Sequence, residues 1–395
     1  MKKVLIVGPL LSISGYGYHS RQLFNFFINN KDYEVSSVIL PWGNTSWFLN
    51  RDLEEGLIDK IVKSSIDKST ILKKSFDIGV HIQLPDEWNP SYAKKNIGVS
   101  AFVETDICSK VWLNCIDKVD KVIVPSTFTK SVILNSESNQ SRKKEFDKKV
   151  HVIPEYYHEI FDKENEQESK IQHTLNNIET KNNFLTVGQL TSHNEDLDRK
   201  NLIKTIEIFC NKYRDDKETG LIVKTSLGRS NTLDKKNTKM IFTNIIKKLK
   251  KGSDYPRIYL LHGDLSPQDL KTLYSHEKVN YYISLTKGEG YGLPLLEAAR
   301  CGLPIIATNW SGHLDFLRDE FIKVDYQLKE IPQEKIDQKI FIKGSKWALF
   351  KRNSILKSLK NLDNQKIKVD KKFYQENYSR KAIEKQYLDF FKRFL

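Results

Sequence analysis

The chain has 395 residues, of which 39% are hydrophobic and 11% aromatic, and it carries a formal net charge of +14 at pH 7. This apolar content excludes a disordered chain, and the length exceeds one ordinary hydrophobic core, so we expect two domains. The positive charge suits an anionic partner such as a nucleotide, an acidic membrane surface or nucleic acid. Since lysine is abundant throughout, compositional bias explains the charge nearly as well.

The opening segment MKKVLIVGPLLSI places an apolar run after two lysines, as a signal peptide does. No convincing cleavage site follows, and the run leads directly into SGYGYHSR, so we predict a buried first β-strand. No stretch reaches the ~18 apolar residues that span a bilayer. We therefore expect a cytoplasmic protein, soluble or peripheral at the inner face of the membrane. Its four cysteines lack metal-ligand spacing and are expected to be reduced: Cys108, Cys115, Cys210 and Cys301.

Short apolar runs alternate with longer amphipathic segments, a rhythm typical of βα units and of a mostly parallel sheet. Six strands are expected in the first half, at residues 4–7, 35–40, 77–82, 97–103, 121–124 and 150–153. Six more are expected at 184–187, 221–224, 257–262, 280–285, 304–307 and 321–324. The polar stretch 163–182 between them is the predicted linker. The sequence thus predicts an α/β fold with two doubly wound, Rossmann-like domains at 1–162 and 183–370.

The segment KGEGYGLPLLEAARCGLP, residues 287–304, carries the most specific pattern. Pro294 fits the first turn of a helix, and Gly302 followed by Pro304 fits the end of one. Unpaired N–H groups at the start of that helix would hold a diphosphate. The glycines just before it would let the diphosphate approach closely: Gly288, Gly290 and Gly292.

Two carboxylates in this segment, Glu289 and Glu297, are separated by seven residues. Such a pair alone is common on solvated helix faces. In the context GEGYGLPLLEA it resembles the signature of retaining GT-B-fold glycosyltransferases with a glycosyl-transferase group 1 domain. The resemblance implies that Glu289 contacts the donor sugar and Glu297 the nucleotide ribose, with Tyr291 and Leu293 in the same donor-binding loop.

The resemblance also implies an architecture. Two Rossmann-like domains of a GT-B fold would face an interdomain cleft, and the first would be completed by a C-terminal helix at 379–395. That helix has apolar positions at helical spacing, and a basic amphipathic membrane anchor is the alternative interpretation.

Cationic partners for the diphosphate are expected at DRKN, residues 198–201, which resembles the basic phosphate-binding position of the family. We assign this role to Arg199 and Lys200. The family more often has an arginine directly after the preceding strand, where this chain has Gln189 followed by the insertion TSHNEDLD. Lys224, at a strand end, is either a further phosphate contact or merely exposed.

Asp196 and Asp198 form a D-x-D, a pattern that binds a divalent metal in a different glycosyltransferase fold. The surrounding loop is basic, and the resembled enzymes use cationic side chains and helix N-termini in place of a metal. We therefore predict no metal site and no cofactor.

Gly15 and Gly17 in SGYGYHSR follow the first strand. They do not complete a dinucleotide fingerprint, and a tight turn is an equal alternative. The resemblance places this loop near the donor phosphates and the acceptor, so both glycines are candidate binding residues.

The acceptor side is expected in the first domain. Glu104 would orient an acceptor hydroxyl or serve a local salt bridge, and His81 would lie near the transferred sugar or be a satisfied core histidine. Trp42, Trp47 and Trp88 are expected in loops, where aromatic rings stack on sugars or bases.

These features predict a retaining, metal-independent enzyme that transfers a hexosyl or related sugar from a nucleotide-diphosphate sugar to a hydroxyl group. A UDP-sugar is the first expectation and a GDP-sugar the next. The expected acceptor is a glycan or glycolipid in cell-envelope or exported glycan synthesis. Two alternatives remain: transfer to a modified DNA base, with nucleic acid as the partner, and a non-catalytic GT-B-like accessory subunit.

Overall fold

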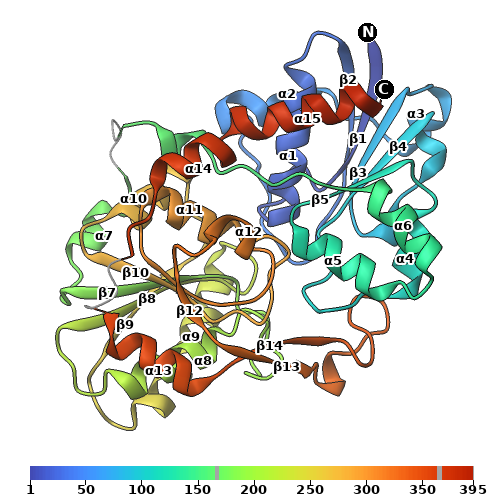
Figure 1. The fold of residues 1–395 in the computed structure, drawn as a ribbon. Helices are drawn as coiled ribbons and strands as arrows, with labels where there is room; N and C mark the ends of the chain where they lie inside the picture. Colours follow the sequence, from blue (N-terminus) through green and yellow to red (C-terminus); the bar gives the residue numbers. More distant parts are fainter. Residues whose placement is uncertain (165–168, 363–366, 395) are drawn as a thin grey trace. The chain divides into compact units, whose positions relative to one another are not determined.

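A computed structural model describes residues 1–164, 169–362 and 367–394 of the chain (Figure 1). The chain divides into two compact units. Unit 1 comprises residues 1–156, 337–345 and 381–395, and unit 2 comprises residues 157–336 and 346–380. Of the predicted linker 163–182, residues 165–168 lie outside the described part, and helix α7 (Gln172–Asn176) packs in the core of unit 2 through Leu175.

Unit 1 is built on a six-stranded parallel sheet with the order β2-β1-β3-β4-β5-β6. Its strands are β1 (Lys2–Gly8), β2 (Tyr33–Ile39), β3 (Ile78–Ile82), β4 (Lys95–Val99), β5 (Lys121–Val124) and β6 (Val150–Val152). Val4 and Ile6 enter the core on one face, whereas Leu5 and Val7 enter the core on the other. Burial on both faces explains why β1 reads as an unbroken apolar run.

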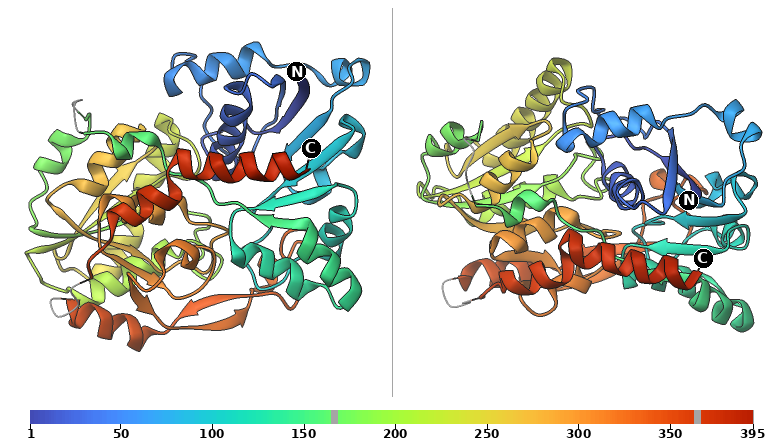
Figure 2. Two further views of the ribbon diagram at one scale, coloured as in Figure 1. Left: turned by 45° about the horizontal axis from the view of Figure 1, so that its top comes forward. Right: turned by 90° about the horizontal axis from the view of Figure 1, so that it is seen from above.

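Helices cover both faces of this sheet: α1 (Gly15–Ile28), α2 (Leu57–Lys63), α3 (Lys68–Lys73), α4 (Lys110–Ile116), α5 (Thr127–Ser136), α6 (Gln140–Lys149) and α15 (Arg380–Phe394). Helix α15, red in Figure 1 and Figure 2, lies along unit 1. Phe26 of α1 contacts Tyr387 and Phe391 of α15, with ring centroids 5.6 and 5.7 Å apart. The apolar face that also fits a membrane anchor is therefore buried in the protein. Leu395, the last residue of the predicted helix, lies outside the described residues.

One short segment of unit 1 comes from far along the sequence. In residues 337–345, Ile340 and Phe341 pack against the core cluster around Trp112. Lys339 forms an ion pair of 2.9 Å with Asp86. This addition to unit 1 was not predicted from the sequence.

Unit 2 contains a second six-stranded parallel sheet, with the order β12-β11-β10-β7-β8-β9. Its strands are β7 (Asn182–Val187), β8 (Thr219–Thr225), β9 (Arg257–His262), β10 (Val279–Ser284), β11 (Ile305–Thr308) and β12 (Ile322–Val324). Its other helices are α8 (Leu202–Lys212), α9 (Thr232–Lys250), α10 (Pro267–Ser275), α11 (Leu293–Cys301), α12 (Leu314–Leu317), α13 (Arg352–Lys360) and α14 (Lys371–Tyr378). An antiparallel hairpin of β13 (Tyr326–Glu330) and β14 (Lys346–Phe350) completes the unit.

In the two units together, short 3-10 turns link elements at 54–56, 85–87, 90–92, 159–162 and 333–335.

The twelve predicted parallel strands and the α/β class with two doubly wound sheets are confirmed. The strand order reverses between β1 and β3 in unit 1 and between β7 and β10 in unit 2. Ligands of such sheets bind outside the carboxyl ends of the strands at these reversal points. The loops that follow β1, β7 and β10 are therefore where a site is expected, while the facing arrangement of the two domains stays a prediction.

Candidate functional site

The glycine-rich loop of unit 2 leads from β10 into α11, as predicted. Gly292 is the residue before the helix and has φ = +102°, and Gly302 ends the helix with φ = +82°. No side chain caps the N-terminus of α11 within the described residues. Pro294 has no N–H, and the Leu295 and Leu296 N–H groups donate to Gly292 O at 2.9 and 3.3 Å. An anionic ligand at this end of α11 would therefore be favoured by the positive end of the helix dipole and by the Leu293 N–H.

The loop that follows β11 supports this glycine-rich loop from behind. The Glu289 N–H donates to Ser311 Oγ at 2.9 Å, and the Gly312 N–H donates to Glu289 O at 2.9 Å. A Cβ atom on Gly312 would lie 2.2 Å from Gly290 O, so only glycine permits this approach. Ser311 Oγ also lies 3.4 Å from Nδ1 of the buried His313, whose Nε2–H donates to Thr308 O at 2.8 Å.

Ser311, Gly312 and His313 were missed by the sequence analysis. Their function depends on contacts with a loop about twenty residues earlier in the chain. The motif SGH, shortly after the predicted strand 304–307, was the only local signal.

The central interaction of the site joins Glu289 to two cations. Lys200 Nζ donates to both carboxylate oxygens of Glu289 at 2.8 Å. Arg199 Nη1 lies 3.4 Å from Glu289 Oε2 and donates to Gly288 O at 2.5 Å. Glu289 is 7% exposed, so this is a nearly buried ion-pair network at the head of the glycine-rich loop. The structure thus brings together Arg199, Lys200, Gly288 and Glu289, which the sequence analysis had assigned to one site.

The protonation state of Glu289 follows from these contacts. Burial alone would raise the pKa of its carboxyl group, but the charges of Lys200 and Arg199 outweigh burial and lower the pKa to about 2. Glu289 is therefore a carboxylate at neutral pH and accepts hydrogen bonds.

The insertion TSHNEDLD, which directly precedes Arg199 and Lys200, is held in place by its own side chains. Asp198 is fully buried, and its carboxylate accepts from the Leu202 N–H at 2.7 Å and from Thr191 Oγ1 at 2.8 Å. Lys287, at the start of the glycine-rich loop, donates from Nζ to Glu195 O at 2.9 Å and to Asp196 O at 2.7 Å. The inserted loop and the glycine-rich loop are therefore fixed to each other.

The D-x-D pattern does not form a common site. Asp198 is buried in the helix-capping interactions just described, whereas Asp196 is exposed. Among residues 1–164, 169–362 and 367–394, no cluster of three or more His, Cys, Asp or Glu side chains is arranged to hold a metal ion.

Glu297, on α11, lies in a different electrostatic environment from Glu289. Tyr274 OH donates to Glu297 Oε2 at 3.1 Å. Burial raises the pKa of Glu297 to about 7, against the smaller opposing effects of Tyr274 and of the charge on Lys224. Burial likewise lowers the pKa of Lys224, against the attraction of Asp264 and Glu297. Lys224 therefore belongs with Glu297 rather than with the cations at Glu289.

The two remaining predicted residues of this loop pack inside unit 2. Tyr291 is 4% exposed, and its ring lies edge-on to Phe316 at 5.3 Å between centroids. Leu293 is half-buried against the same core. Both side chains stabilise the loop.

In unit 1, the two glycines of SGYGYHSR have different roles. Gly15 begins α1, and a Cβ atom there would meet nothing within 4 Å. A Cβ atom on Gly17 would lie 2.0 Å from Ser12 O, so the tight turn requires this glycine. Ser14 caps the helix by accepting from the Gly17 N–H at 3.1 Å.

Three further candidates of unit 1 lie near the carboxyl ends of β3 and β4 or pack on those strands. His81 is fully buried, and its Nε2 lies 3.0 Å from Asn96 Oδ1, which favours the interpretation as a core histidine. Glu104 is half-buried in the loop after β4. Trp88 is 4% exposed and packs on Gly98, where a Cβ atom would lie 2.6 Å from the indole, so its ring cannot serve as a stacking surface.

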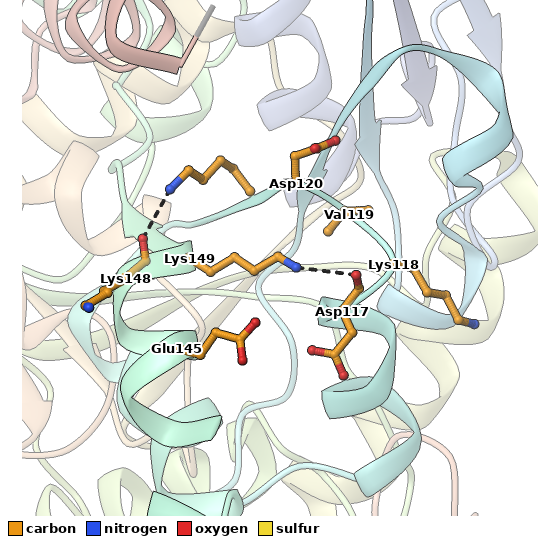
Figure 3. Close-up of a pocket in the computed structure, with 8 residues that line it drawn as sticks. Asp117, Lys118, Val119, Asp120, Glu145, Lys148 and Lys149 are labelled. Carbon is orange, nitrogen blue, oxygen red and sulfur yellow. Dashed lines mark hydrogen bonds between the residues drawn. The ribbon is translucent and has the colours of Figure 1, made fainter. Parts of the chain in front are cut away.

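A surface depression of about 470 Å³ lies elsewhere on unit 1, at the amino-terminal edge of β5 (Figure 3). Its lining mixes acidic and basic side chains: Asp117, Lys118, Val119, Asp120, Lys121, Glu145, Lys148 and Lys149. Lys149 Nζ donates to Asp117 O and Lys121 Nζ to Lys148 O, each at 3.4 Å. Because the depression lies at the amino-terminal edge of the sheet, it is at the opposite edge from the expected site, which is at the carboxyl ends of the strands.

Three comparisons place this geometry among known proteins. The family model "Glycosyl transferases group 1" matches residues 244–340. No curated protein sequence matches the chain.

Within the described residues, no helix has both the length and the apolar character needed to cross a membrane.

Several solved structures resemble the whole chain. A glycosyltransferase from Rickettsia africae aligns with a TM-score of 0.64 and 13% identity, over 99% of this chain and 98% of that one. A sucrose-phosphate synthase from Thermosynechococcus elongatus aligns with a TM-score of 0.62 and 15% identity, over 100% and 99%. Anabaena HepE in complex with UDP and glucose aligns with a TM-score of 0.56 and 11% identity, over 99% and 100%. The resemblance expected from the sequence is confirmed: the chain has the GT-B glycosyltransferase fold and carries a glycosyl transferases group 1 region at residues 244–340.

Proposed function

We propose that this protein is a retaining glycosyltransferase that uses a nucleotide-diphosphate sugar as donor. The proposal rests chiefly on one observation: Lys200 holds both carboxylate oxygens of Glu289 at 2.8 Å, beside the uncapped N-terminus of α11. Cations and the positive end of a helix dipole suit a diphosphate, and a fixed carboxylate suits sugar hydroxyls.

A diphosphate would compete with Glu289 for Lys200 and Arg199. The phosphate oxygens would then take the cationic hydrogen bonds, and the carboxylate would be released toward the hydroxyl groups of the transferred sugar. Glu297, eight residues after Glu289 in the sequence and within α11, would accept hydrogen bonds from the ribose. This division gives each of the two glutamates a separate part of the donor.

In the transfer itself, the bond from the anomeric carbon to the diphosphate oxygen breaks, and a bond from the same carbon to the acceptor oxygen forms. The acceptor's proton passes to the leaving phosphate on the same face, as the resembled family implies, so the sugar keeps its anomeric configuration. Lys200, Arg199 and the first turn of α11 stabilise the charge that develops on the diphosphate. These groups supply the stabilisation without a divalent cation.

UDP is the proposed nucleotide, with GDP as the next candidate, because the chain resembles a structure that holds UDP and glucose. Thermal unfolding of the protein in EDTA, with UDP-, GDP-, ADP- and dTDP-sugars in turn, tests this assignment. A ligand at a hundred times its Kd adds ~2.7 kcal/mol to native-state stability. A stability increase with one nucleotide is expected. No increase with any donor, even with magnesium or manganese added, would favour the accessory subunit.

The role of Glu289 is tested with Glu289→Ala. We expect loss of most donor hydrolysis and transfer, with UDP affinity retained. Glu277→Ala is the matched control, because Glu277 is exposed at the amino end of β10, opposite the donor loop. Normal turnover by the Glu289 variant would contradict the assignment.

A further inference from the structure

A stacked pair of aromatic rings lies beside the reversal point of the sheet in unit 1. The ring of Tyr16, in the first turn of α1, stacks on Trp42 with centroids 4.1 Å apart and planes at 26°. The Tyr16 hydroxyl is fixed by Ser100 Oγ at 2.8 Å and accepts from the Ala101 N–H at 3.0 Å. Trp42 is half-buried, and its ring stacks on a tyrosine whose hydroxyl is held by two hydrogen bonds.

The chain around Trp42 is tied to the loop that follows β1. The Ile13 N–H donates to Ser46 O and the Phe48 N–H donates to Leu11 O, both at 2.8 Å. Beneath them, the buried Arg21 donates from Nη1 to Leu10 O at 3.1 Å and to Ser12 O at 2.8 Å, and its guanidinium lies 4.7 Å from the centroid of the Phe48 ring. The loop and the aromatic segment therefore form one ordered surface.

Hydroxyl groups and one carboxylate lie at this surface. The buried Ser12 Oγ lies 2.8 Å from both Ser14 Oγ and Thr45 Oγ1. The Tyr16 hydroxyl contacts Ser100 and Ala101, which lie in the same loop after β4 as the half-buried Glu104. Rings combined with a carboxylate fit a ligand that has apolar C–H faces and many hydroxyl groups.

The negative charge of Glu104 distinguishes between ligands that an aromatic ring alone would accept. A nucleic acid or a phosphate-bearing polymer would bring its anionic groups toward Glu104 and be repelled. An uncharged sugar gains a hydrogen bond from the same carboxylate. The choice between a saccharide and a nucleic acid, which the sequence left open, thus favours the saccharide.

We propose that Trp42, supported by Tyr16, binds a ring of an uncharged saccharide acceptor, with Glu104 accepting a hydrogen bond from one of its hydroxyl groups. This inference rests on the proposed glycosyltransferase function and specifies its acceptor. It concerns unit 1 alone, whereas donor binding depends on unit 2.

Binding is measured by saturation-transfer NMR on the full-length protein with three kinds of probe. The first is a panel of methyl glycosides of glucose, galactose, mannose and N-acetylglucosamine, with the corresponding disaccharides. The second is the 6-phosphates of the same sugars, and the third is a short DNA duplex. We expect at least one uncharged glycoside to bind and its 6-phosphate to bind at least tenfold more weakly.

Variants assign the binding to the stacked rings. Trp42→Ala should weaken glycoside binding at least tenfold, whereas Trp42→Phe, which keeps an aromatic face, should stay within about threefold of the parent. Leu49→Ala is the control, because Leu49 is 86% exposed in the same segment. Leu49→Ala should leave glycoside binding, UDP affinity and donor hydrolysis unchanged, and thermal unfolding of each variant reports whether it is correctly folded.

Two kinds of result overturn the inference. One is binding of the 6-phosphates or of the DNA duplex as strong as that of the uncharged glycosides. The other is absence of glycoside binding, or glycoside binding that is unaffected in Trp42→Ala. Failure of the proposed function would instead appear as absence of donor binding and hydrolysis in the parent protein, so the two failures are distinguishable.

Discussion

Replacing Lys200 by methionine removes the ammonium group that holds Glu289 while keeping most of the side-chain stem. The contacts in unit 2 lower the pKa of Glu289 from 4.5 to about 2. One pKa unit corresponds to ~1.4 kcal/mol, so the ionised form of Glu289 is favoured on folding by about 3 kcal/mol. Arg199, at 3.4 Å, compensates only in part. We expect Lys200→Met to lower the free energy of unfolding at pH 7 by about 3 kcal/mol, consistent with a broken buried ion pair.

The pH dependence gives this prediction its sign. Because the folded-state pKa of Glu289 is lowered, its contribution to stability is complete above pH 4.5 and is lost as the pH falls through about 2. The difference between the parent and Lys200→Met should therefore be largest near pH 7 and fall by more than half at pH 3.

Urea unfolding at both pH values, followed by fluorescence, measures this difference. The same substitution in a Glu289→Gln background should cost less than about 1 kcal/mol, because no buried carboxylate is then left without its partner. An equal cost in both backgrounds, or a cost independent of pH, would refute the electrostatic explanation.

Three further outcomes are expected. Burial raises the folded-state pKa of Glu297 from 4.5 to about 7. Glu297 should therefore contribute about 3 kcal/mol of stability below pH 4.5, and this contribution is lost as the pH rises through 7. In urea titrations at pH 5 and 8, Glu297→Gln should remove this pH-dependent loss. In Gly312→Ala the new Cβ atom would lie 2.2 Å from Gly290 O, so the substitution should displace the glycine-rich loop and weaken UDP binding, measured by calorimetry, at least tenfold. Gly15→Ala should leave UDP binding unchanged because its Cβ atom meets nothing within 4 Å. Trp347→Ala removes a ring that is 1% exposed, so it should lower the free energy of unfolding by about 3–5 kcal/mol; a change below 1 kcal/mol would show that the ring is not part of the core.

The parallel strands could be predicted from the sequence because both faces of each sheet are buried. In unit 2, alternate residues of β8 enter opposite cores, Ile222 on one face and Leu221 and Val223 on the other, so the whole segment is apolar. The ends of α11 were predictable for a local reason, because a proline and two glycines mark them. Strand β13 was missed because its residues are mostly exposed and lack the apolar alternation of a half-buried strand.

The rest of the site depends on contacts between distant parts of the sequence. Ser311 and Gly312 each support the glycine-rich loop through one hydrogen bond. No periodic pattern in the sequence predicts such a contact. His81 illustrates the reverse case. It was placed near a strand end by its position in the sequence, but its ring is fully buried beside Asn96, a contact that only the packing of β3 against β4 defines.

The departure from the family pattern at Gln189 has a structural explanation. Gln189 is exposed, and its side chain donates to Leu227 O at 3.2 Å, so it provides no charge next to Glu289. After the insertion, the side chain of Arg199 instead donates to Gly288 O at 2.5 Å. The Arg199 backbone is fixed at both groups: its N–H donates to Thr191 Oγ1 and its carbonyl accepts from the Lys287 N–H, both at 2.9 Å. A guanidinium and an ammonium thus both lie beside Glu289. Electrostatic stabilisation depends on where the charges lie rather than on their place in the sequence, so the arginine that follows the insertion supplies a positive charge beside Glu289 although Gln189 has none.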